Sequence, residues 1–324
     1  MADYKAIKGH TIQTVSGDPG TIVDGLIWYD SVARKVQGSK TAAGSWATGE
    51  ALPAVMVKNA GAGIQTAAIV FGGLDADGVA DESYTYDGTD WTDIGAMANN
   101  RQMLGGCGTS TAALGAGGYP VPARGADTEE WNGSAWSETA NLGTSRYGCH
   151  SAGTQTAALC ITGHTYPGSE TADVEQYDGS SWSQIADVNT SRRQHAAAGT
   201  STAALAIGGN NGGSVSDAVE SWNGTAWTET HEINTARDAL GGDGTSTLAL
   251  VWGGTSPARD ETEVYDGSSW TESGDLNSGR WGTSGGGTTS SAVTAGGFVL
   301  PGNTASTATE EWTQASAAVT FTSS

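Results

Sequence analysis

The sequence predicts an all-β protein built from six repeats of four short antiparallel strands, preceded by an N-terminal arm that contains a β-hairpin. Three recurrences within the 324 residues support this prediction. In each repeat a short apolar run closes on glycine, and in five of the six an aromatic residue then precedes Asp-Gly or Asn-Gly and a tryptophan follows. A fixed period means that one structural unit fills each interval. The tryptophans recur every 43 to 46 residues, at Trp46, Trp91, Trp136, Trp182, Trp227 and Trp270.

The apolar run of each repeat predicts a buried strand. The first copy, residues 66–73, reads Thr-Ala-Ala-Ile-Val-Phe-Gly-Gly. It is too short for a helix, and its final glycines indicate a place where side chains do not fit. Equivalent runs begin at Thr111, Thr156, Thr202, Thr247 and Ser290.

The phrase before each tryptophan predicts a tight hairpin between two more strands. The first copy is Tyr86-Asp-Gly-Thr-Asp-Trp91, and similar phrases end at Trp136, Trp182, Trp227 and Trp270. Asp-Gly and Asn-Gly are strong hairpin signals because the turn needs positive φ angles, which glycine and asparagine tolerate.

A recurrent arginine opens the remaining strand of each repeat. It is found at Arg101, Arg146, Arg192, Arg237 and Arg280, and the first repeat has Lys58 near the expected position. We expect these arginines and the tryptophans to serve packing between units and backbone hydrogen bonding. Four-stranded units of about 45 residues are typical of the blades of a β-propeller.

The order of arginine, apolar run, aromatic residue, turn and tryptophan resembles the kelch motif over residues 46–312. This resemblance implies a six-bladed, kelch-like β-propeller. Trp312 ends the last repeat without a following hairpin, whereas Trp46 stands ahead of the first repeat, so we expect their strands to pair and close the last blade. The expected divisions are an arm over 1–43, a propeller over 44–314 and a C-terminal tail over 315–324.

Composition excludes several function classes. With 35 acidic and 14 basic residues the net charge is −21, which disfavours nucleic acid and anionic membranes as partners. The sequence has neither an apolar run long enough to cross a bilayer nor an N-terminal signal peptide, so we expect synthesis in a host cytoplasm without membrane insertion. A hydrophobic content of 37%, with 12 tryptophans, is enough for a packed core.

No metal or cofactor is expected. The spacing of Cys107, Cys149 and Cys160 does not match zinc or redox motifs, so these cysteines should be small core residues. An alternative places Cys149 opposite Cys160 across a hairpin, if Thr154 and Gln155 form the turn. The five histidines lack ligand spacing, and the phrase Asp75-Ala-Asp-Gly78 lacks the later glutamate of a calcium loop.

The N-terminal arm differs in charge from the remainder of the chain. Residues 1–58 hold all five lysines and are nearly neutral. Within them, residues 25–36 alternate around Asp30-Ser31 and predict a hairpin, which either packs on the propeller rim or attaches to a neighbouring subunit. Residues 1–10 and 26–36 resemble N-terminal segments of tailed-bacteriophage virion proteins with kelch-like repeats, especially aquatic ones. The resemblance implies docking to other virion proteins through Tyr4, Lys5, Lys8, Trp28, Tyr29, Arg34 and Lys35. A homo-oligomer within the particle is a further expectation.

The links that follow the apolar runs are expected to form a recognition surface. Antiparallel strands place these links and the arginine links on one side of the propeller, here called the loop face, with the tight turns on the other. The links vary in length and hold five of the seven prolines, and variable loops on a rigid scaffold usually carry recognition. The candidate ligand-binding residues are Tyr119, Arg124, His164, Tyr166, Arg259 and Phe298.

The primary functional hypothesis is a non-enzymatic structural or adhesion protein of a phage particle, of the tail-fibre or tail-tip type. Its arm would dock on the virion, and its loop face would recognise a host-surface glycan or protein. The alternative is a lectin-like, carbohydrate-binding propeller. A distant third is a glycosidase of the sialidase type, but here Asp and Gly adjoin in the turn, whereas an Asp-box separates them by one residue.

Overall fold

The computed structural model describes residues 13–16, 27–120, 125–255 and 259–320. These ranges contain strands and loops and no helix, and hence no helix that could span a bilayer. The chain divides into two compact units. One unit comprises Ser45–Thr313, and the other comprises Met1–Gly44 together with Gln314–Ser324. Four residues predicted to bind partners lie outside the described ranges: Tyr4, Lys5, Lys8 and Arg124.

The unit Ser45–Thr313 contains six antiparallel sheets with four main strands each. The first two sheets are β5 (Ala60–Ile64), β6 (Ala67–Leu74), β7 (Val79–Tyr86), β8 (Trp91–Ala96), and β9 (Gly105–Thr109), β10 (Ala112–Ala116), β11 (Thr128–Trp131), β12 (Trp136–Glu138). The third and fourth are β14 (His150–Thr154), β15 (Ala157–Thr165), β16 (Glu170–Tyr177), β17 (Trp182–Gln184), and β18 (Ala196–Thr200), β19 (Ala203–Ile207), β20 (Val219–Trp222), β21 (Trp227–Glu229). The fifth and sixth are β22 (Gly241–Gly244), β23 (Ala249–Trp252), β24 (Thr262–Tyr265), β25 (Trp270–Glu272), and β27 (Ser284–Thr288), β28 (Ser291–Ala295), β31 (Thr309–Thr313), β4 (Ser45–Thr48).

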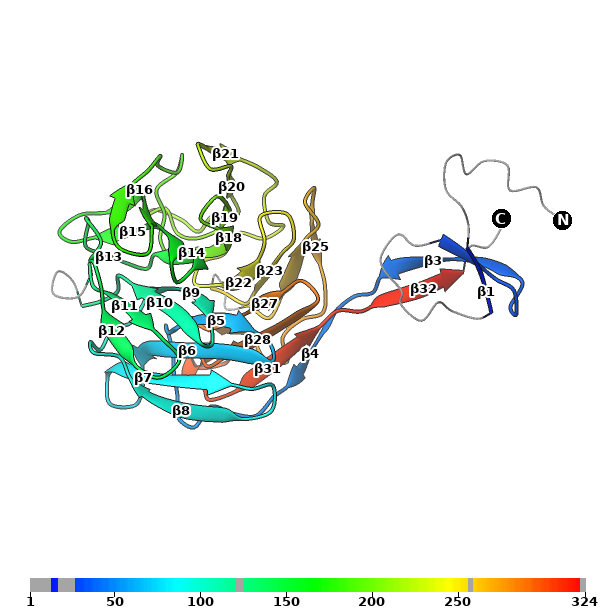
Figure 1. Cartoon of the computed structure of the whole chain (residues 1–324), viewed down its shortest axis with the longest axis horizontal. Coiled ribbons are helices and arrows are strands. Elements are labelled where there is room, and N and C mark those ends of the chain that lie inside the picture. The colour runs from blue at the N-terminus through cyan, green and yellow to red at the C-terminus, as the bar shows by residue number, and fades with distance from the viewer. Residues whose placement is uncertain (1–12, 17–26, 121–124, 256–258, 321–324) are drawn as a thin grey trace. The chain divides into compact units, whose positions relative to one another are not determined.

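The innermost strands of these sheets contact one another in a closed cycle. The order is β5, β9, β14, β18, β22 and β27, and β27 contacts β5 again. Figure 1 shows these strands gathered at the centre of the unit, with the other strands of each sheet further out. This arrangement of four-stranded antiparallel sheets is that of a β-propeller.

The two ends of the repeat region meet in one sheet, as predicted. Strand β31 pairs with β4, and Trp312 lies directly opposite Trp46. The two indole rings are 5.4 Å apart, and Trp46 also packs 5.6 Å from Trp252 of the preceding sheet. Because the last sheet takes strands from both ends of the unit, neither end can detach without exposing a sheet edge.

Five repeats bury an arginine against a glutamate. In the fourth repeat, the Arg192 guanidinium lies 2.6 Å from Glu220 and donates to the backbone carbonyls of Gly208 and Ala218. Glu220 also accepts bonds from backbone N–H groups of the link before the arginine, including that of Asn189. The pair therefore ties the incoming link to two strands of its own sheet. The other pairs are Arg101 with Glu129, Arg146 with Glu175, Arg237 with Glu263 and Arg280 with Glu310.

The first repeat replaces this ion pair with apolar contact. Met56 stands two residues before Lys58, as Arg101 stands two residues before Met103 in the next repeat. Tyr84, two residues before Tyr86, occupies the place of the glutamate, and Met56 and Tyr84 belong to one buried cluster. The position of the arginine is therefore taken by Met56, and Lys58 stands two residues after it. Replacing both partners leaves no buried charge uncompensated.

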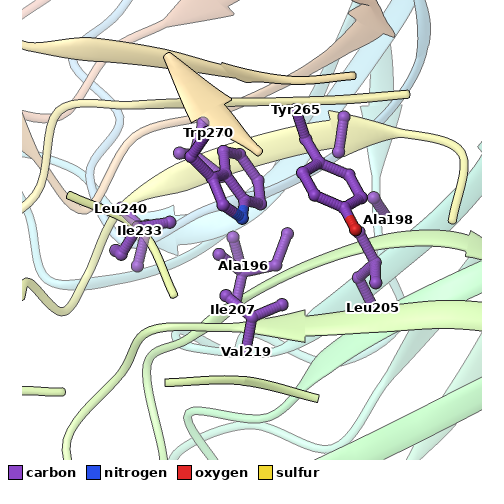
Figure 2. Packing of buried hydrophobic residues seen from close by; sticks show 11 residues of the cluster. Ala196, Ala198, Leu205, Ile207, Val219, Ile233, Leu240, Tyr265 and Trp270 are labelled. Carbon is purple, nitrogen blue, oxygen red and sulfur yellow. The ribbon is translucent and has the colours of Figure 1, made fainter. Parts of the chain in front are cut away.

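Tryptophans of each outer strand join neighbouring sheets. In Figure 2, Trp270 of the fifth sheet packs with Ile207 and Val219 of the fourth. Four equivalent tryptophans also donate their indole N–H to a hydroxyl in the preceding sheet. These bonds join Trp46 to Thr262, Trp91 to Thr309, Trp136 to Ser83 and Trp182 to Thr128.

Two sheets have valine in place of that hydroxyl, and the indole N–H groups that face them differ in their hydrogen bonding. Val174 stands where Thr128 stands one sheet earlier, and the buried Trp227 indole N–H has no hydrogen-bond partner among the described residues. Val219 stands at the same position in the next sheet, where Trp270 donates instead to the His231 carbonyl at 2.9 Å.

The second unit is a small sheet formed from both chain ends. Its strands are β1 (Gln13–Val15), β2 (Ile27–Asp30), β3 (Lys35–Thr41) and β32 (Ser316–Thr320), in the order β1-β2-β3-β32. Strands β2 and β3 form the hairpin predicted around Asp30-Ser31. Residues 316–320, assigned by the sequence to a separate tail, instead pair with β3, because an edge of the hairpin offers them a strand partner.

One residue predicted to dock on a partner, Trp28, belongs instead to the core of the smaller unit. Trp28 is fully buried within its unit and cannot contact a partner. Tyr29 is half-buried, whereas Arg34 and Lys35 are exposed beside Val32, at the end of the hairpin.

The three cysteines are free and buried, as core residues should be. The proposed alternative, with Cys149 opposite Cys160, is wrong in register. The turn lies at Gln155-Thr156, one residue later than assumed, so that Ser151 faces Cys160.

Removing one member of a buried ion pair should destabilise the propeller strongly. The change Glu220→Ala leaves the Arg192 guanidinium buried without its carboxylate, at an expected cost of about 3 to 5 kcal/mol in the free energy of unfolding. Urea denaturation measures this cost. Glu261→Ala, which removes the partly exposed partner of Arg259, is the control and should cost less than about 1 kcal/mol. Equal effects of the two changes would contradict the role assigned to the pair.

Supplying the missing hydroxyl should stabilise the protein. We expect Val174→Thr to give Trp227 a hydrogen-bond acceptor and to raise the unfolding free energy by about 1 kcal/mol. The matched control is Val219→Thr, where Trp270 already has an acceptor and a new buried hydroxyl brings no gain. Thermal denaturation of both variants distinguishes the cases, and a loss of stability in both would refute the explanation.

Candidate functional site

The loop face carries a circle of side chains around the propeller axis. In each repeat the residue directly after the arginine, or after Met56 in the first repeat, pairs across the backbone with the first residue after the glycine of the apolar run. We call these twelve residues the loop-face ring. Its cross-strand pairs are Val57 with Leu74, Gln102 with Tyr119, Tyr147 with His164, Arg193 with Asn210, Asp238 with Thr255, and Trp281 with Phe298.

The backbone fixes where each ring residue stands. Gly72 has φ of 63°, and a Cβ at this position would lie 2.7 Å from the Arg101 carbonyl oxygen. The glycine thus allows the backbone at Arg101 to approach the end of the apolar strand. The buried arginine then holds the next residue at the edge of the sheet.

One part of the loop-face ring is aromatic. The rings of Tyr119 and Tyr147 have centroids 5.9 Å apart, and those of Tyr147 and His164 are 5.1 Å apart. Tyr119 is 43% exposed, and Tyr147 and His164 are half-buried. We call these three residues the aromatic arc. It offers apolar ring surface to solvent on a rigid support.

An ion network continues the aromatic arc. Glu170 lies 3.3 Å from His164 Nδ1 and 3.4 Å from Arg193 Nε. Desolvation acts to raise the pKa of Glu170, but its backbone hydrogen bond, His164 and Arg193 outweigh it and hold that pKa below the ordinary value. Glu170 is therefore an anion at neutral pH, and it compensates the charge of Arg193.

The ring becomes polar beyond Arg193. Asp238 accepts hydrogen bonds from the Asn210 amide at 3.2 Å and from the Thr255 hydroxyl. Asp238 is buried, whereas Asn210 and Thr255 are half-buried. These groups offer hydrogen-bonding capacity close to the axis.

A second aromatic pair lies in the sixth repeat. Trp281 stacks on Phe298 with centroids 4.6 Å apart, and the Lys58 ammonium lies 5.7 Å and 5.9 Å from the two rings. Desolvation lowers the pKa of Lys58. Lys58 directly follows the ring residue Val57, and its ammonium lies over the faces of these two aromatic rings.

A closed circle of backbone hydrogen bonds lies just inside the loop-face ring. In each repeat the residue that follows Val57, or its equivalent after the arginine, donates its N–H to the carbonyl of the equivalent residue one repeat earlier, at 2.6 to 2.9 Å. The participants are Lys58, Met103, Gly148, Gln194, Ala239 and Gly282, all with positive φ angles. They surround a hollow of about 40 Å³ on the axis.

A second, polar cavity of about 80 Å³ lies along the axis between the innermost strands. His150 lines both cavities, and burial lowers its pKa to about 4. Asp243 of β22 lines the axial cavity and accepts bonds from the N–H groups of Gly244 and Gly287. Desolvation nevertheless raises the pKa of Asp243 to about 6.

The structure brings together half of the residues predicted to bind a ligand. Tyr119, His164 and Phe298 lie in the loop-face ring. Tyr166 is 59% exposed in the link beyond His164, and Arg259 lies 2.8 Å from Glu261. Arg124 lies outside the described residues.

The sequence analysis did not identify the ring residues that directly follow the arginines. Tyr147, Arg193 and Trp281 each follow a recurrent arginine and were not singled out, although this position differs in every repeat. That variation next to a constant residue was the available signal. Glu170 was missed because its partners, His164 and Arg193, belong to two different repeats.

Within the described ranges, no group of three or more His, Cys, Asp or Glu side chains is placed to hold a metal ion. No family model and no curated protein matches the sequence. The fold is similar to the solved structure of a protein named YjhT, with a TM-score of 0.68 and 14% sequence identity. The similarity covers 81% of this chain and 95% of YjhT, and it shows the β-propeller fold.

The axial carboxylate should make stability depend on pH. Because the folded-state pKa of Asp243 lies above its unfolded value, the protein loses stability as the pH rises from about 4 to about 6, by up to about 3 kcal/mol. Asp243→Asn removes this loss, so the stability difference between the variant and the natural protein should grow in favour of the variant across that interval. Denaturant unfolding at several pH values measures the difference. A difference independent of pH would refute the assignment.

Proposed function

We propose that this chain is a six-bladed, kelch-like β-propeller that serves as a non-enzymatic adhesion or structural protein of a bacteriophage particle. In this proposal the unit formed by the two chain ends attaches the protein to other virion proteins. The loop-face ring recognises the host surface. The observation that carries the proposal is the division of the chain into a closed propeller with a varied ring and a separate unit that gathers both chain ends.

The closed contacts support six blades. Six innermost strands contact one another in a cycle, and six backbone hydrogen bonds form a circle inside the loop-face ring. The spacing of the repeats and the recurrent arginine support the likeness to kelch proteins.

The chemistry of the ring supports binding rather than catalysis. Glu170 is engaged by His164 and Arg193, and Asp238 accepts hydrogen bonds from Asn210 and Thr255. These carboxylates stabilise the ring itself. A surface of aromatic and polar side chains on a rigid support is suited to recognition.

The exposed end of the β2–β3 hairpin supports the attachment role of the smaller unit. Val32 is 74% exposed, and Arg34 and Lys35 are exposed beside it. An apolar side chain flanked by cations suits an acidic partner surface. The resemblance of residues 26–36 to phage virion segments covers this hairpin.

Reversing the charge of the hairpin should impair assembly. We expect the full-length double variant Arg34→Glu, Lys35→Glu to fold normally, because both side chains are exposed, and to be incorporated about tenfold less into purified phage particles. Quantitative immunoblotting of particles measures incorporation. The control variant Asp90→Lys, Glu232→Lys changes two exposed carboxylates of the propeller and should incorporate normally. Normal incorporation of the hairpin variant would contradict the docking role.

A further inference from the structure

We propose that the aromatic arc binds a neutral carbohydrate, with a pyranose ring stacked on Tyr119 and bordered by Tyr147, and its hydroxyls bonded to the neighbouring polar groups. This inference rests on the proposed function, since it names the ligand class of the same loop face. It does not depend on the attachment role of the smaller unit.

The arc offers the aromatic surface that sugar recognition needs. The C–H face of a pyranose packs on aromatic rings, and Tyr119 presents 43% of its surface for such contact. Tyr147 lies between Tyr119 and His164, at 5.9 Å and 5.1 Å, and its ring is inclined by 77° to the first and by 53° to the second, so the arc offers the face of Tyr119 with Tyr147 beside it. Tyr166, which is 59% exposed, follows His164 by two residues and adds apolar surface in the same link.

Polar groups continue the aromatic arc beyond His164. Glu170 lies 3.3 Å from His164, and Arg193 lies 3.4 Å from Glu170. A guanidinium has five donors, and the Arg193 side chain is 29% exposed, so Arg193 can donate to a sugar hydroxyl while Glu170 holds it in place. Their mutual contact holds them in place before the ligand arrives, which lowers the entropic cost of binding.

Charge favours a neutral sugar over an acidic one. The chain carries a net charge of −21, which repels polyanions over the whole surface. Arg193, whose ion network continues the arc, is already compensated by Glu170. Among the residues that the structure describes, this guanidinium would therefore offer an acidic glycan no uncompensated charge.

The first experiment screens the full-length protein against neutral and acidic oligosaccharides. We expect neutral glycans to bind, with an affinity that changes little between low and high salt, because no ion pair is formed with the ligand. Binding confined to acidic glycans, or the absence of any glycan binding, would overturn the proposal.

Substitutions then locate the site. Tyr147→Ala, which removes the central ring, should weaken binding about tenfold or more, whereas Tyr147→Phe should stay within about threefold. Tyr119→Ala provides a second loss-of-ring variant if Tyr147→Ala is found unfolded by circular dichroism. Leu248→Ala is the control, because Leu248 is an exposed apolar residue at a tight turn on the opposite face. Unchanged binding by a folded Tyr147→Ala or Tyr119→Ala variant would overturn the proposed site.

Treated host cells separate this proposal from the proposed function. If periodate oxidation of cell-surface sugars abolishes binding of the full-length protein and protease treatment does not, the carbohydrate proposal is supported. If protease abolishes binding and periodate does not, host recognition stands and the carbohydrate proposal fails. If untreated host cells are not bound at all, the recognition function itself fails.

Discussion

The buried arginine found in five of the six repeats makes the interaction on which the propeller most depends. It joins three segments that are distant in sequence: the incoming link, the end of the apolar strand and the strand that carries its glutamate. Arg237, for example, donates to the carbonyls of Gly253 and Glu261 and pairs with Glu263. A guanidinium can do this because its five donors are fixed in one plane. Without it, the carbonyls at the loop side of the sheet would be buried without donors.

The exception in the first repeat explains how the ion pair can be lost without harm. Met56 and Tyr84 replace both partners and pack with Leu52, Val70 and Val293. A charge remaining alone would be far more costly than either the pair or the apolar substitute. The first repeat is also the one that lies beside the joint formed by β4 and β31. The closure of the propeller there relies on strand pairing and on contacts among Trp46, Trp252 and Trp312.

The periodic parts of the fold could be predicted from sequence, and the parts that depend on pairing between distant segments could not. The repeated turns and the pairing of Trp312 with Trp46 follow from local patterns that recur at a fixed interval. By contrast, nothing local indicates that residues 316–320 pair with β3, since that contact joins the two ends of the chain. Trp28 was misjudged for a similar reason, because its burial depends on the sheet that these strands form. Within the site, Tyr119, His164 and Phe298 were predicted from their loops. Tyr147 and Arg193 each directly follow a recurrent arginine, and the sequence analysis assigned those arginines a structural role only.

The adjacency of arginine and ring residue links the stability of the propeller to its capacity for recognition. Arg146 is buried and bonded, and the next residue, Tyr147, belongs to the aromatic arc. The same step of one residue leads from Arg192 to Arg193 and from Arg280 to Trp281. Because the arginine fixes the backbone, the neighbouring side chain is held in position whatever its chemistry. The ring can therefore differ in every repeat, from Gln102 to Trp281, without disturbing the sheets. A scaffold of this kind separates the residues that maintain the fold from those that meet a ligand, although they are neighbours in sequence.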